Sequence, residues 1–353
     1  MEQTKTVRPG EELNTESLLS YLNEQMEDLP DEELVVRQFQ AGHSNLTYLL
    51  KIGNWEAVLR RPPLGPVAAR AHDMARESTV MATLAPHLSI IPEPLHFCSD
   101  QGIIGAPFFL MERKKGIVLD TEFPEDLEAT PQLARTISEQ MVNRLVDLHA
   151  INYEKTKLVE LTKPEGFLER QVHGWIKRYH QAKTHDHKGL EELTTFLSDR
   201  IPTSQDATVI HYDYKLNNAM FSKDGQEMVG LFDWEMTTVG DPLCDVGVAL
   251  SYWIEPNDPT LLKRGFGKPP VTVQEGFFSR RDWVELYAKK SGRHVDHIEY
   301  YLTFAYFKLA VIAQQIYYRY HKGQTNDTRF AQFDQTVAAL IHHGRETATT
   351  ELT

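Results

Sequence analysis

Residues 209–221 read Val209-Ile210-His211-Tyr212-Asp213-Tyr214-Lys215-Leu216-Asn217-Asn218-Ala219-Met220-Phe221. The stretch opens with apolar residues typical of a strand, passes through a polar loop and closes with a second short apolar segment. Asp224-Gly225 then gives a strong hairpin-turn signal, and residues 227–232 return as a largely apolar segment that ends at Asp233. The sequence therefore predicts a polar loop followed by a β-hairpin, with a further carboxylate at the end of the hairpin.

The predicted hairpin brings two oxygen-bearing side chains to one end. Pairing its strands about the turn places Asn218 opposite about Leu231, one pleat from Asp233. An amide oxygen and a carboxylate oxygen suit Mg²⁺, which takes one or two protein ligands together with substrate phosphates and water. Asp213 lies just before, on the same loop, where it can accept or orient the proton of a hydroxyl group. Lys215 adds a positive charge close by, unless it is only a solvated loop residue.

Composition narrows the class of protein. The 353 residues carry 37 Lys+Arg against 50 Asp+Glu, a net charge of −13, which argues against nucleic acid or an anionic membrane as a partner. Two cysteines, Cys98 and Cys244, cannot form a disulfide framework or a four-thiolate zinc site. Residues 1–14 lack the apolar segment of a signal peptide, and residues 300–318 are interrupted by polar side chains, as in a buried helix. We therefore expect a cytoplasmic protein.

The chain length favours two domains or two lobes. Upstream of residue 113 the pattern is rich in strands, expected at Leu34–Phe39, Thr47–Ile52, Glu56–Arg60, Leu95–Cys98 and Pro107–Met111. The expected helices are Thr15–Met26, Ala69–Leu84, Pro131–Ile151, Phe167–Lys183, Leu190–Arg200, Asp245–Trp253, Arg280–Ser291, His297–Tyr318 and Phe330–His342. The prediction is an α+β protein with a small antiparallel sheet in lobe 1–113, which includes an N-terminal helix, and a larger, mostly helical lobe 114–353.

The polar loop resembles a known superfamily. His211-x-Asp213-x-Lys215-x-x-Asn218, followed by Asp233, resembles the catalytic and metal-binding loops of protein-kinase-like enzymes. The segments Asp233-Trp234-Glu235 and Gly240-Asp241-Pro242-x-x-Asp245 are similar to the aminoglycoside phosphotransferase and choline kinase branch.

Residues 58–65, with Ala71-His72 and Arg76-Glu77, look most like the phosphotransferase-like domains that are fused to some acyl-CoA dehydrogenases, and their free-standing bacterial relatives. The resemblance spans about residues 34–320 and implies a bilobal protein-kinase-like fold. The first lobe would bind the nucleotide, and the second would carry the catalytic and metal-binding loops and the acceptor pocket.

The resemblance also implies a role for individual residues. Asp213 would be the catalytic base or hydroxyl-orienting group, His211 would brace the loop, and Lys215 would add charge at the site. Asn218 and Asp233 would bind Mg²⁺. The nucleotide-binding residues would be Gly42, Ser44 and Asn45 on the phosphate loop, Arg60 and its helix partner Glu77 at the α/β-phosphates, and Met111, Glu112 and Arg113 as a hinge whose backbone could hydrogen-bond a purine.

Several alternatives stay open from the sequence. The phosphate loop has one glycine where kinases have three, and the alternative interpretation of Gly42 is a plain hairpin turn. Arg60 stands where the superfamily usually has Lys, so a planar guanidinium with several N–H donors replaces a compact ammonium group. Arg61 and Arg70 are alternative phosphate ligands. Arg60 and Glu77 are otherwise a surface ion pair, and Asp233 a helix cap or turn residue. Asp241 and Asp245 are expected to cap and brace the helix that follows them.

These residues predict a small-molecule kinase. It would move the γ-phosphoryl group of ATP or GTP to a hydroxyl of a small molecule, with Mg²⁺ neutralising the developing charge. The alternative is a regulatory module of little catalytic activity that binds a nucleotide or an acyl thioester; protein kinase activity is disfavoured because no activation-loop pattern follows Asp233. The sequence specifies neither the acceptor, nor ATP against GTP, nor the oligomeric state.

Overall fold

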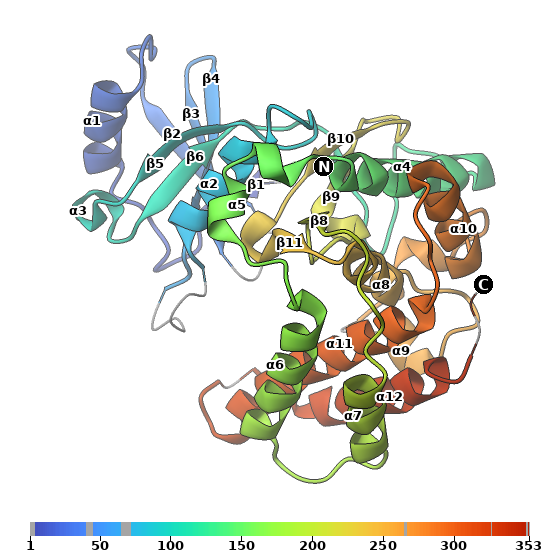
Figure 1. Ribbon diagram of the computed structural model, residues 1–353. Coiled ribbons are helices and arrows are strands. Elements are labelled where there is room, and N and C mark those ends of the chain that lie inside the picture. The colour runs from blue at the N-terminus through green and yellow to red at the C-terminus, as the bar shows by residue number, and fades with distance from the viewer. Residues whose placement is uncertain are drawn as a thin grey trace. The chain divides into compact units, whose positions relative to one another are not determined.

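A computed structural model describes residues 4–39, 45–64, 72–264, 267–325, 327–350 and 352 (Figure 1). The chain divides into two compact units. Unit 1 comprises Met1–Gly116 together with Val229–Glu235, and unit 2 comprises Ile117–Met228 and Met236–Thr353. The segment Val229–Glu235 belongs to unit 1 although it lies far along the chain; Leu231 N–H, for example, donates a hydrogen bond of 2.8 Å to the carbonyl of Ile90.

Unit 1 is built on an antiparallel sheet in the strand order β1-β2-β3-β4-β6-β5. The strands are β1 (Thr4–Lys5), β2 (Leu34–Phe39), β3 (Leu46–Ile52), β4 (Trp55–Arg61), β5 (Pro94–Cys98) and β6 (Phe108–Met111). The five predicted strands are confirmed to within a residue at each end, and β1 is an additional edge strand that is too short to show in the sequence. Gly53 makes the tight turn between β3 and β4 at φ +55°, a conformation that favours glycine.

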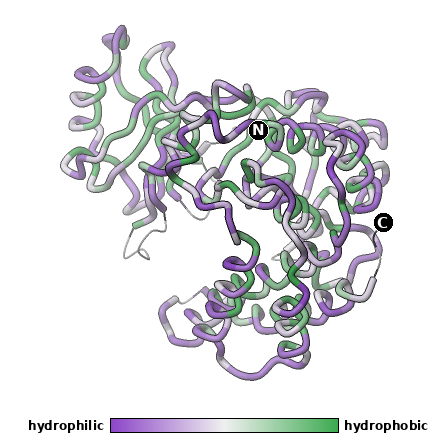
Figure 2. The backbone as a smooth tube through the Cα atoms, viewed as in Figure 1, coloured by the Kyte–Doolittle hydropathy of each residue, from purple (hydrophilic) through white to green (hydrophobic). Residues whose placement is uncertain are grey.

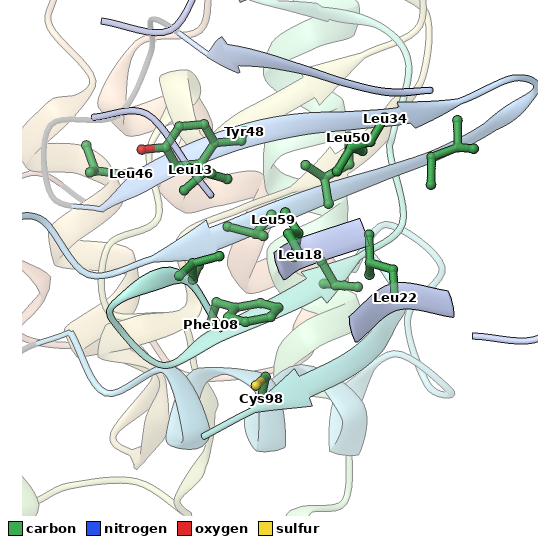
Figure 3. Close-up of a cluster of buried hydrophobic side chains, with 13 residues drawn as sticks. Leu13, Leu18, Leu22, Leu34, Leu46, Tyr48, Leu50, Leu59, Cys98 and Phe108 are labelled. Carbon is green, nitrogen blue, oxygen red and sulfur yellow. The ribbon is translucent and has the colours of Figure 1, made fainter. Parts of the chain in front are cut away.

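The described part of unit 1 also contains the helices α1 (Thr15–Gln25), α2 (Met74–Leu84) and α3 (Gln101–Ile104). Leu18 and Leu22 on one side of α1 are buried in the hydrophobic cluster that also contains Tyr48, Leu59 and Phe108 (Figure 3). Leu18 and Leu22, four residues apart, thus form the buried side of α1.

Helix α2 begins later than the sequence predicted. Its expected start, Ala69, lies outside the described residues, and the helix begins at Met74 because the Asp73 side chain accepts the Arg76 N–H as its N-cap. His72, one residue earlier, has φ +59° and is not helical.

Unit 2 is mostly helical. Its longer helices are α4 (Pro131–His149), α6 (Phe167–Ala182), α7 (Leu190–Asp199), α8 (Pro242–Tyr252), α10 (Arg280–Ser291), α11 (Ile298–His321) and α12 (Phe333–Thr347). Shorter helical segments are α5 (Leu158–Leu161), α9 (Thr260–Arg264), η1 (Tyr153–Lys155), η2 (Leu216–Asn218), η4 (Val271–Val273) and η5 (Thr328–Gln332); η3 (Trp234–Met236) spans the boundary between the units. The predicted long helices are confirmed, with ends that differ by at most five residues.

Helix α11 forms the centre of unit 2, where it packs against α12, α8 and α6. A Cβ atom at Gly247 of α8 would lie 2.6 Å from the carbonyl oxygen of Tyr301, so only glycine permits the close approach of α8 and α11. Cys244 on α8 and Cys98 in unit 1 are both buried free thiols. Within the described ranges, no helix has the length and apolar character needed to span a membrane.

Short strands frame the polar loop in unit 2. Strand β8 (Thr208–Ile210) pairs with β11 (Thr238–Gly240), and β7 (Ile117–Val118) pairs with β9 (Ala219–Phe221). After β9 the chain turns at Gly225, which has φ +72°, and Ser222 N–H donates to the Glu227 carbonyl at 2.8 Å, the register that the sequence predicted. The returning strand is β10 (Met228–Leu231). In Figure 2 hydrophobic residues, in green, are frequent along the strands, and hydrophilic residues, in purple, are frequent in the loops between elements.

Candidate active site

The polar loop of unit 2 joins β8 to the 3₁₀ turn η2 and brings three of the predicted site residues together. The side chain of Asp213 is 19% exposed, and Lys215 Nζ lies 2.8 Å from its Oδ2. Asn218 Nδ2 donates to the same oxygen at 3.1 Å and to the Asp213 carbonyl at 2.9 Å. The amide nitrogen of Asn218 thus faces Asp213, which leaves its amide oxygen as the atom suited to a hard cation.

The loop has a specific backbone conformation at its start. Tyr212 has φ +66°, a left-handed conformation that is uncommon for a bulky residue and tends to occur at functional sites. Its carbonyl accepts a hydrogen bond of 2.8 Å from Lys308 Nζ, which also lies 3.6 Å from the centre of the Tyr212 ring. The strained residue directly before Asp213 is therefore held by a cation from helix α11.

A buried carboxylate on helix α8 holds the same loop from the other side. Asp245 Oδ2 accepts the His211 N–H at 2.6 Å, and Asp245 Oδ1 accepts the Tyr212 N–H at 2.8 Å. Burial acts to raise the pKa of Asp245, but hydrogen bonds from His149 and the loop amides outweigh it and hold the pKa below its ordinary value. His149 in turn pairs with the Tyr287 hydroxyl at 2.7 Å.

The sequence prediction for Asp245 was wrong. Asp241 is the N-cap of α8, where it accepts the Leu243 N–H at 2.9 Å, whereas Asp245 lies within the helix and binds the polar loop. A carboxylate on an otherwise apolar helix is the signal that could have found it, because an ionised side chain is buried only with partners.

His211 is fully buried at the root of the loop. Its Nδ1 accepts the Asp213 N–H at 3.3 Å, and its ring lies edge-on to Tyr214 with centroids 6.0 Å apart. These contacts are with the loop's own backbone and core, so they suit the bracing role that the sequence predicted.

Unit 1 contains a second group of the predicted residues. Arg60 Nη2 lies 2.6 Å from Asp233 Oδ1, and Arg60 Nε lies 3.2 Å from Glu77 Oε2. Arg60 is 8% exposed and Glu77 is 1% exposed, which excludes the alternative of a surface ion pair. Asp233 has φ +68°, so its backbone adopts the same uncommon conformation as Tyr212, directly before the 3₁₀ turn η3.

Burial affects the two partners of this ion pair in opposite ways. Desolvation raises the pKa of Glu77 to about 7, although the guanidinium of Arg60 partly opposes the shift. Desolvation also disfavours the charged form of Arg60, but Glu77 and Asp233 more than offset it and raise the pKa of Arg60. Arg60 thus stays cationic between two carboxyl groups, one of which is a predicted magnesium ligand.

Asn45 is the described part of the predicted phosphate loop; Gly42 and Ser44 lie outside the described residues. Asn45 Nδ2 donates to Glu235 Oε2 at 3.2 Å, and Asn45 Oδ1 lies 2.8 Å from His72 Nδ1. Arg76 Nη1 donates to the Glu235 carbonyl at 2.9 Å. These contacts link the end of the loop, the start of α2 and the segment after Asp233 within unit 1.

Arg61 does not fit the alternative role of a phosphate ligand. Successive residues of a strand point to opposite faces of the sheet, so Arg61 faces away from the Arg60 side. Its buried guanidinium donates through Nη1 to the Ile104 carbonyl at 2.8 Å. The other alternative, Arg70, lies outside the described residues.

The predicted hinge follows strand β6. Met111 is buried as the last residue of β6, and Arg113 pairs with Glu56 at 2.8 Å. Glu112 N–H already donates to the Glu93 carbonyl at 2.8 Å, so this amide is not available to a purine. The Glu112 carbonyl and the backbone groups of Met111 and Arg113 remain as candidate hinge contacts.

The burial of Lys308 predicts a specific pH dependence of stability. The side chain is 6% exposed, and desolvation lowers its pKa from 10.5 to about 8, against partial opposition from the carboxylates of Asp213 and Asp245. Between these two pH values Lys308 holds its proton in the unfolded chain and loses it in the folded one. Its contribution to the free energy of unfolding therefore rises with pH. We expect the free energy of unfolding of the wild type, relative to Lys308→Met, to increase by on the order of 3 kcal/mol from pH 8 to pH 10.5.

Urea titrations of the wild type and Lys308→Met across this pH range measure the effect. Subtracting the two free energies of unfolding removes the contribution of groups that titrate equally in both proteins. Below pH 8 the difference should be constant, because both states then hold the proton. A difference that falls, or stays flat, between pH 8 and pH 10.5 would show that Lys308 is not desolvated as described.

Comparisons with known proteins agree with this geometry. Residues 35–268 match the model of the phosphotransferase enzyme family (APH). Acyl-CoA dehydrogenase family member 10 of Mus musculus is 30% identical over 350 residues, which are 99% of this chain and 32% of that protein. The chain thus spans about a third of the length of this relative.

Solved structures extend the comparison. A protein of Ralstonia eutropha JMP134, named as a candidate aminoglycoside phosphotransferase, is 26% identical with a TM-score of 0.79, over 96% of this chain and 98% of that one. Choline kinase of Cryptosporidium parvum Iowa II is 16% identical with a TM-score of 0.60, over 94% and 97% of the two chains. The predicted α+β protein-kinase-like fold and the resemblance stated above are therefore confirmed, and the chain belongs to the phosphotransferase enzyme family.

Proposed function

We propose that this chain transfers the γ-phosphoryl group of ATP or GTP to a hydroxyl group of a small molecule. The arrangement of Asp213 carries the proposal: its carboxylate is partly exposed, fixed by Lys215 and Asn218, and set on a backbone that Asp245 and Lys308 hold. Phosphoryl transfer relies mainly on positioning and electrostatics, and such a rigid, charged loop is suited to both.

Asp213 would receive the acceptor hydroxyl. Lys215 and Asn218 both contact Oδ2, so Oδ1 is the oxygen that would accept the hydroxyl's hydrogen bond and direct its oxygen at the phosphorus. Because bond formation to the incoming oxygen is late in a loose transition state, the proton passes to Asp213 after the hydroxyl has been positioned.

Asn218 and Asp233 are the proposed ligands of Mg²⁺, which when bound would neutralise charge on the phosphate oxygens. Their donor atoms, an amide oxygen and a carboxylate oxygen, are those that Mg²⁺ prefers. Arg60 would contact the α/β-phosphates in place of the usual Lys, with Glu77 and Asp233 fixing the plane of its guanidinium. Asn45 would approach the phosphates beside Gly42 and Ser44.

For the acceptor molecule we propose only a chemical class. A similar chain occurs in a protein named for acyl-CoA dehydrogenation, and a structural relative is named for aminoglycosides. We propose a hydroxylated acyl compound as the first acceptor class to test, with aminoglycosides second, since fold alone does not define a substrate.

A second candidate function is a regulatory module that binds a nucleotide or acyl thioester without transferring a phosphoryl group. The observation that favours it is that Arg60 is already paired with the carboxyl groups of Glu77 and Asp233. These ion pairs would have to weaken before the guanidinium could bind phosphates. Tight nucleotide binding in the absence of any turnover would support this alternative.

Magnesium-dependent turnover tests the proposed function. We expect Asp233→Asn and Asn218→Ala to lower kcat by at least about 100-fold and to raise the Mg²⁺ concentration needed for half-maximal activity, because each removes or weakens an oxygen ligand. A coupled assay of ADP release at varied Mg²⁺ measures both quantities.

Asp199→Asn is a matched control, since Asp199 is an exposed residue at the end of α7 and should leave both quantities unchanged. If Asp233→Asn and Asn218→Ala behave like this control, the assignment of the metal ligands is wrong.

A further inference from the structure

Two histidines and an aspartate meet at a place that the proposed phosphotransferase site does not use. His185 and His187 lie on the loop between α6 and α7, and Asp334 lies in the first turn of α12 (Figure 1). Asp334 Oδ1 is 3.1 Å from Nε2 of His185 and 3.2 Å from Nε2 of His187. One ligand atom from each of the three side chains lies within 4.8 Å of the others.

These separations suit a shared metal ion. Two ligand atoms that lie about 2.0–2.1 Å from a metal at a tetrahedral angle are separated from each other by about 3.4 Å. The nitrogen-to-oxygen distances here are only slightly shorter, so a small ion could enter with little movement of the side chains. Two imidazole nitrogens and one carboxylate oxygen are a set of ligands typical of Zn²⁺, whose sites with three protein ligands take water in the fourth position.

The second nitrogen of each imidazole already has a partner. The Tyr179 hydroxyl lies 2.7 Å from Nδ1 of His187, and Thr184 Oγ1 lies 3.1 Å from Nδ1 of His185. Metal-binding histidines commonly use their other nitrogen in this way, because a hydrogen bond from that nitrogen fixes the ring and keeps the metal-facing nitrogen deprotonated. Both rings are thus oriented with Nε2 toward Asp334.

The loop that carries the histidines is anchored, which favours a preformed site. Gln314 Nε2 on α11 donates to the Ala182 carbonyl at 2.8 Å and to Thr184 Oγ1 at 3.1 Å. His187 is buried and its ring lies 4.5 Å from that of His185, centroid to centroid. Figure 2 shows that the loop itself is hydrophilic, so it has little apolar surface of its own to hold it in place.

We propose that His185, His187 and Asp334 form a zinc site that ties the α6–α7 loop to the start of α12. The zinc would hold the loop to the helix, with water completing its coordination, and would take no part in phosphoryl transfer, because none of the three ligands contacts the loop of Asp213 in the described part of the chain. The proposal does not depend on the phosphotransferase function, and either can fail without the other.

Calorimetric titration with Zn²⁺ tests the site on the full chain after dialysis against EDTA. Excess Mg²⁺ is kept present so that ligands of the hard-oxygen type are occupied. We expect one equivalent of Zn²⁺ to bind, a rise in Tm with added Zn²⁺, and at least about 100-fold weaker binding in His185→Ala and Asp334→Asn. His185 is 48% exposed, so its replacement should not unfold the protein.

His173→Ala is the matched control, since His173 is an exposed histidine on α6 outside the cluster of His185, His187 and Asp334 and should leave Zn²⁺ binding unchanged. Substitution by Co²⁺ gives a second readout: a tetrahedral site should show intense visible absorption that His185→Ala abolishes. Absence of stoichiometric Zn²⁺ binding, or equal binding by the wild type and His185→Ala, would overturn the proposal.

Discussion

Replacing Asp213 with Asn should lower kcat for phosphoryl transfer by roughly 10²–10⁴-fold, the usual contribution of a positioned acid–base group. The amide has nearly the shape of the carboxylate and can still accept hydrogen bonds from Lys215 and Asn218, so the loop should stay folded. What it loses is the negative charge and the basicity that orient the hydroxyl and receive its proton. Steady-state kinetics at saturating Mg²⁺ measure the change.

Nucleotide affinity and thermal stability are the controls for this variant. Both should be close to the wild-type values, because Asp213 is assigned to the acceptor and not to the nucleotide. A kcat within about threefold of the wild type would remove Asp213 from the chemistry, whatever the stability of the variant.

Replacing Asp245 with Asn should produce the largest loss of stability among single substitutions at the site. Asp245 is fully buried and accepts the amides of His211 and Tyr212, besides its contact of 3.3 Å with His149. The side-chain oxygen of an asparagine can accept a hydrogen bond from one of these N–H groups. Its NH₂ group, also a donor, would then face the other N–H, and that hydrogen bond would be lost. Breaking a buried charged network of this kind costs about 3–5 kcal/mol of the free energy of unfolding, which urea denaturation measures.

Asp241→Asn is the matched control, four residues earlier on the same helix. Asn is as good an N-cap as Asp, and the Tyr301 hydroxyl that donates to Asp241 Oδ2 at 2.7 Å can instead accept from the amide NH₂. Burial raises the pKa of Asp241 but the pKa of Asp245 is held low, so a neutral amide should cost much less at Asp241 than at Asp245. We also expect the Asp245 variant, where it is folded, to lose activity, since the loop of Asp213 loses its anchor. Equal effects at both positions would contradict the assignment of Asp245 to the loop.

Local sequence patterns predicted the secondary structure well. Apolar residues bounded by turns predicted the strands of unit 1, and apolar residues at helical spacing predicted α1. The clearest error was the start of α2, where a continuous run of helix-compatible residues concealed the cap at Asp73. Capping is decided by one side chain, and a pattern averaged over several residues does not resolve it.

Residue pattern alone predicted the candidate site only where its residues are close in sequence, whereas the pairing of Arg60 with Glu77 was predicted from the family resemblance. Asp213, Lys215 and Asn218 lie within six positions, and their contacts follow from the loop itself. Asp245 was misassigned because its partners are 33 and 34 residues away, on a different element.

The same reasoning explains why the zinc ligands gave no signal in the sequence. His187 and Asp334 are 147 residues apart, and only the packing of the α6–α7 loop beside α12 brings them together. Likewise, nothing local places the segment Val229–Glu235 in unit 1. Contacts of this kind depend on the tertiary fold, which periodicity does not encode.

The destination of the γ-phosphoryl group is the measurement that tests the central claim most directly. The wild type and Asp213→Asn would be incubated with ATP or GTP labelled at the γ-phosphate, Mg²⁺ and a panel of hydroxylated acyl compounds, amino alcohols and aminoglycosides. We expect label to appear on a hydroxyl oxygen of one acceptor class, only with Mg²⁺, and at least about 100-fold more slowly with Asp213→Asn. Tight nucleotide binding with no label on any organic hydroxyl, or equal transfer by both proteins, would contradict the account.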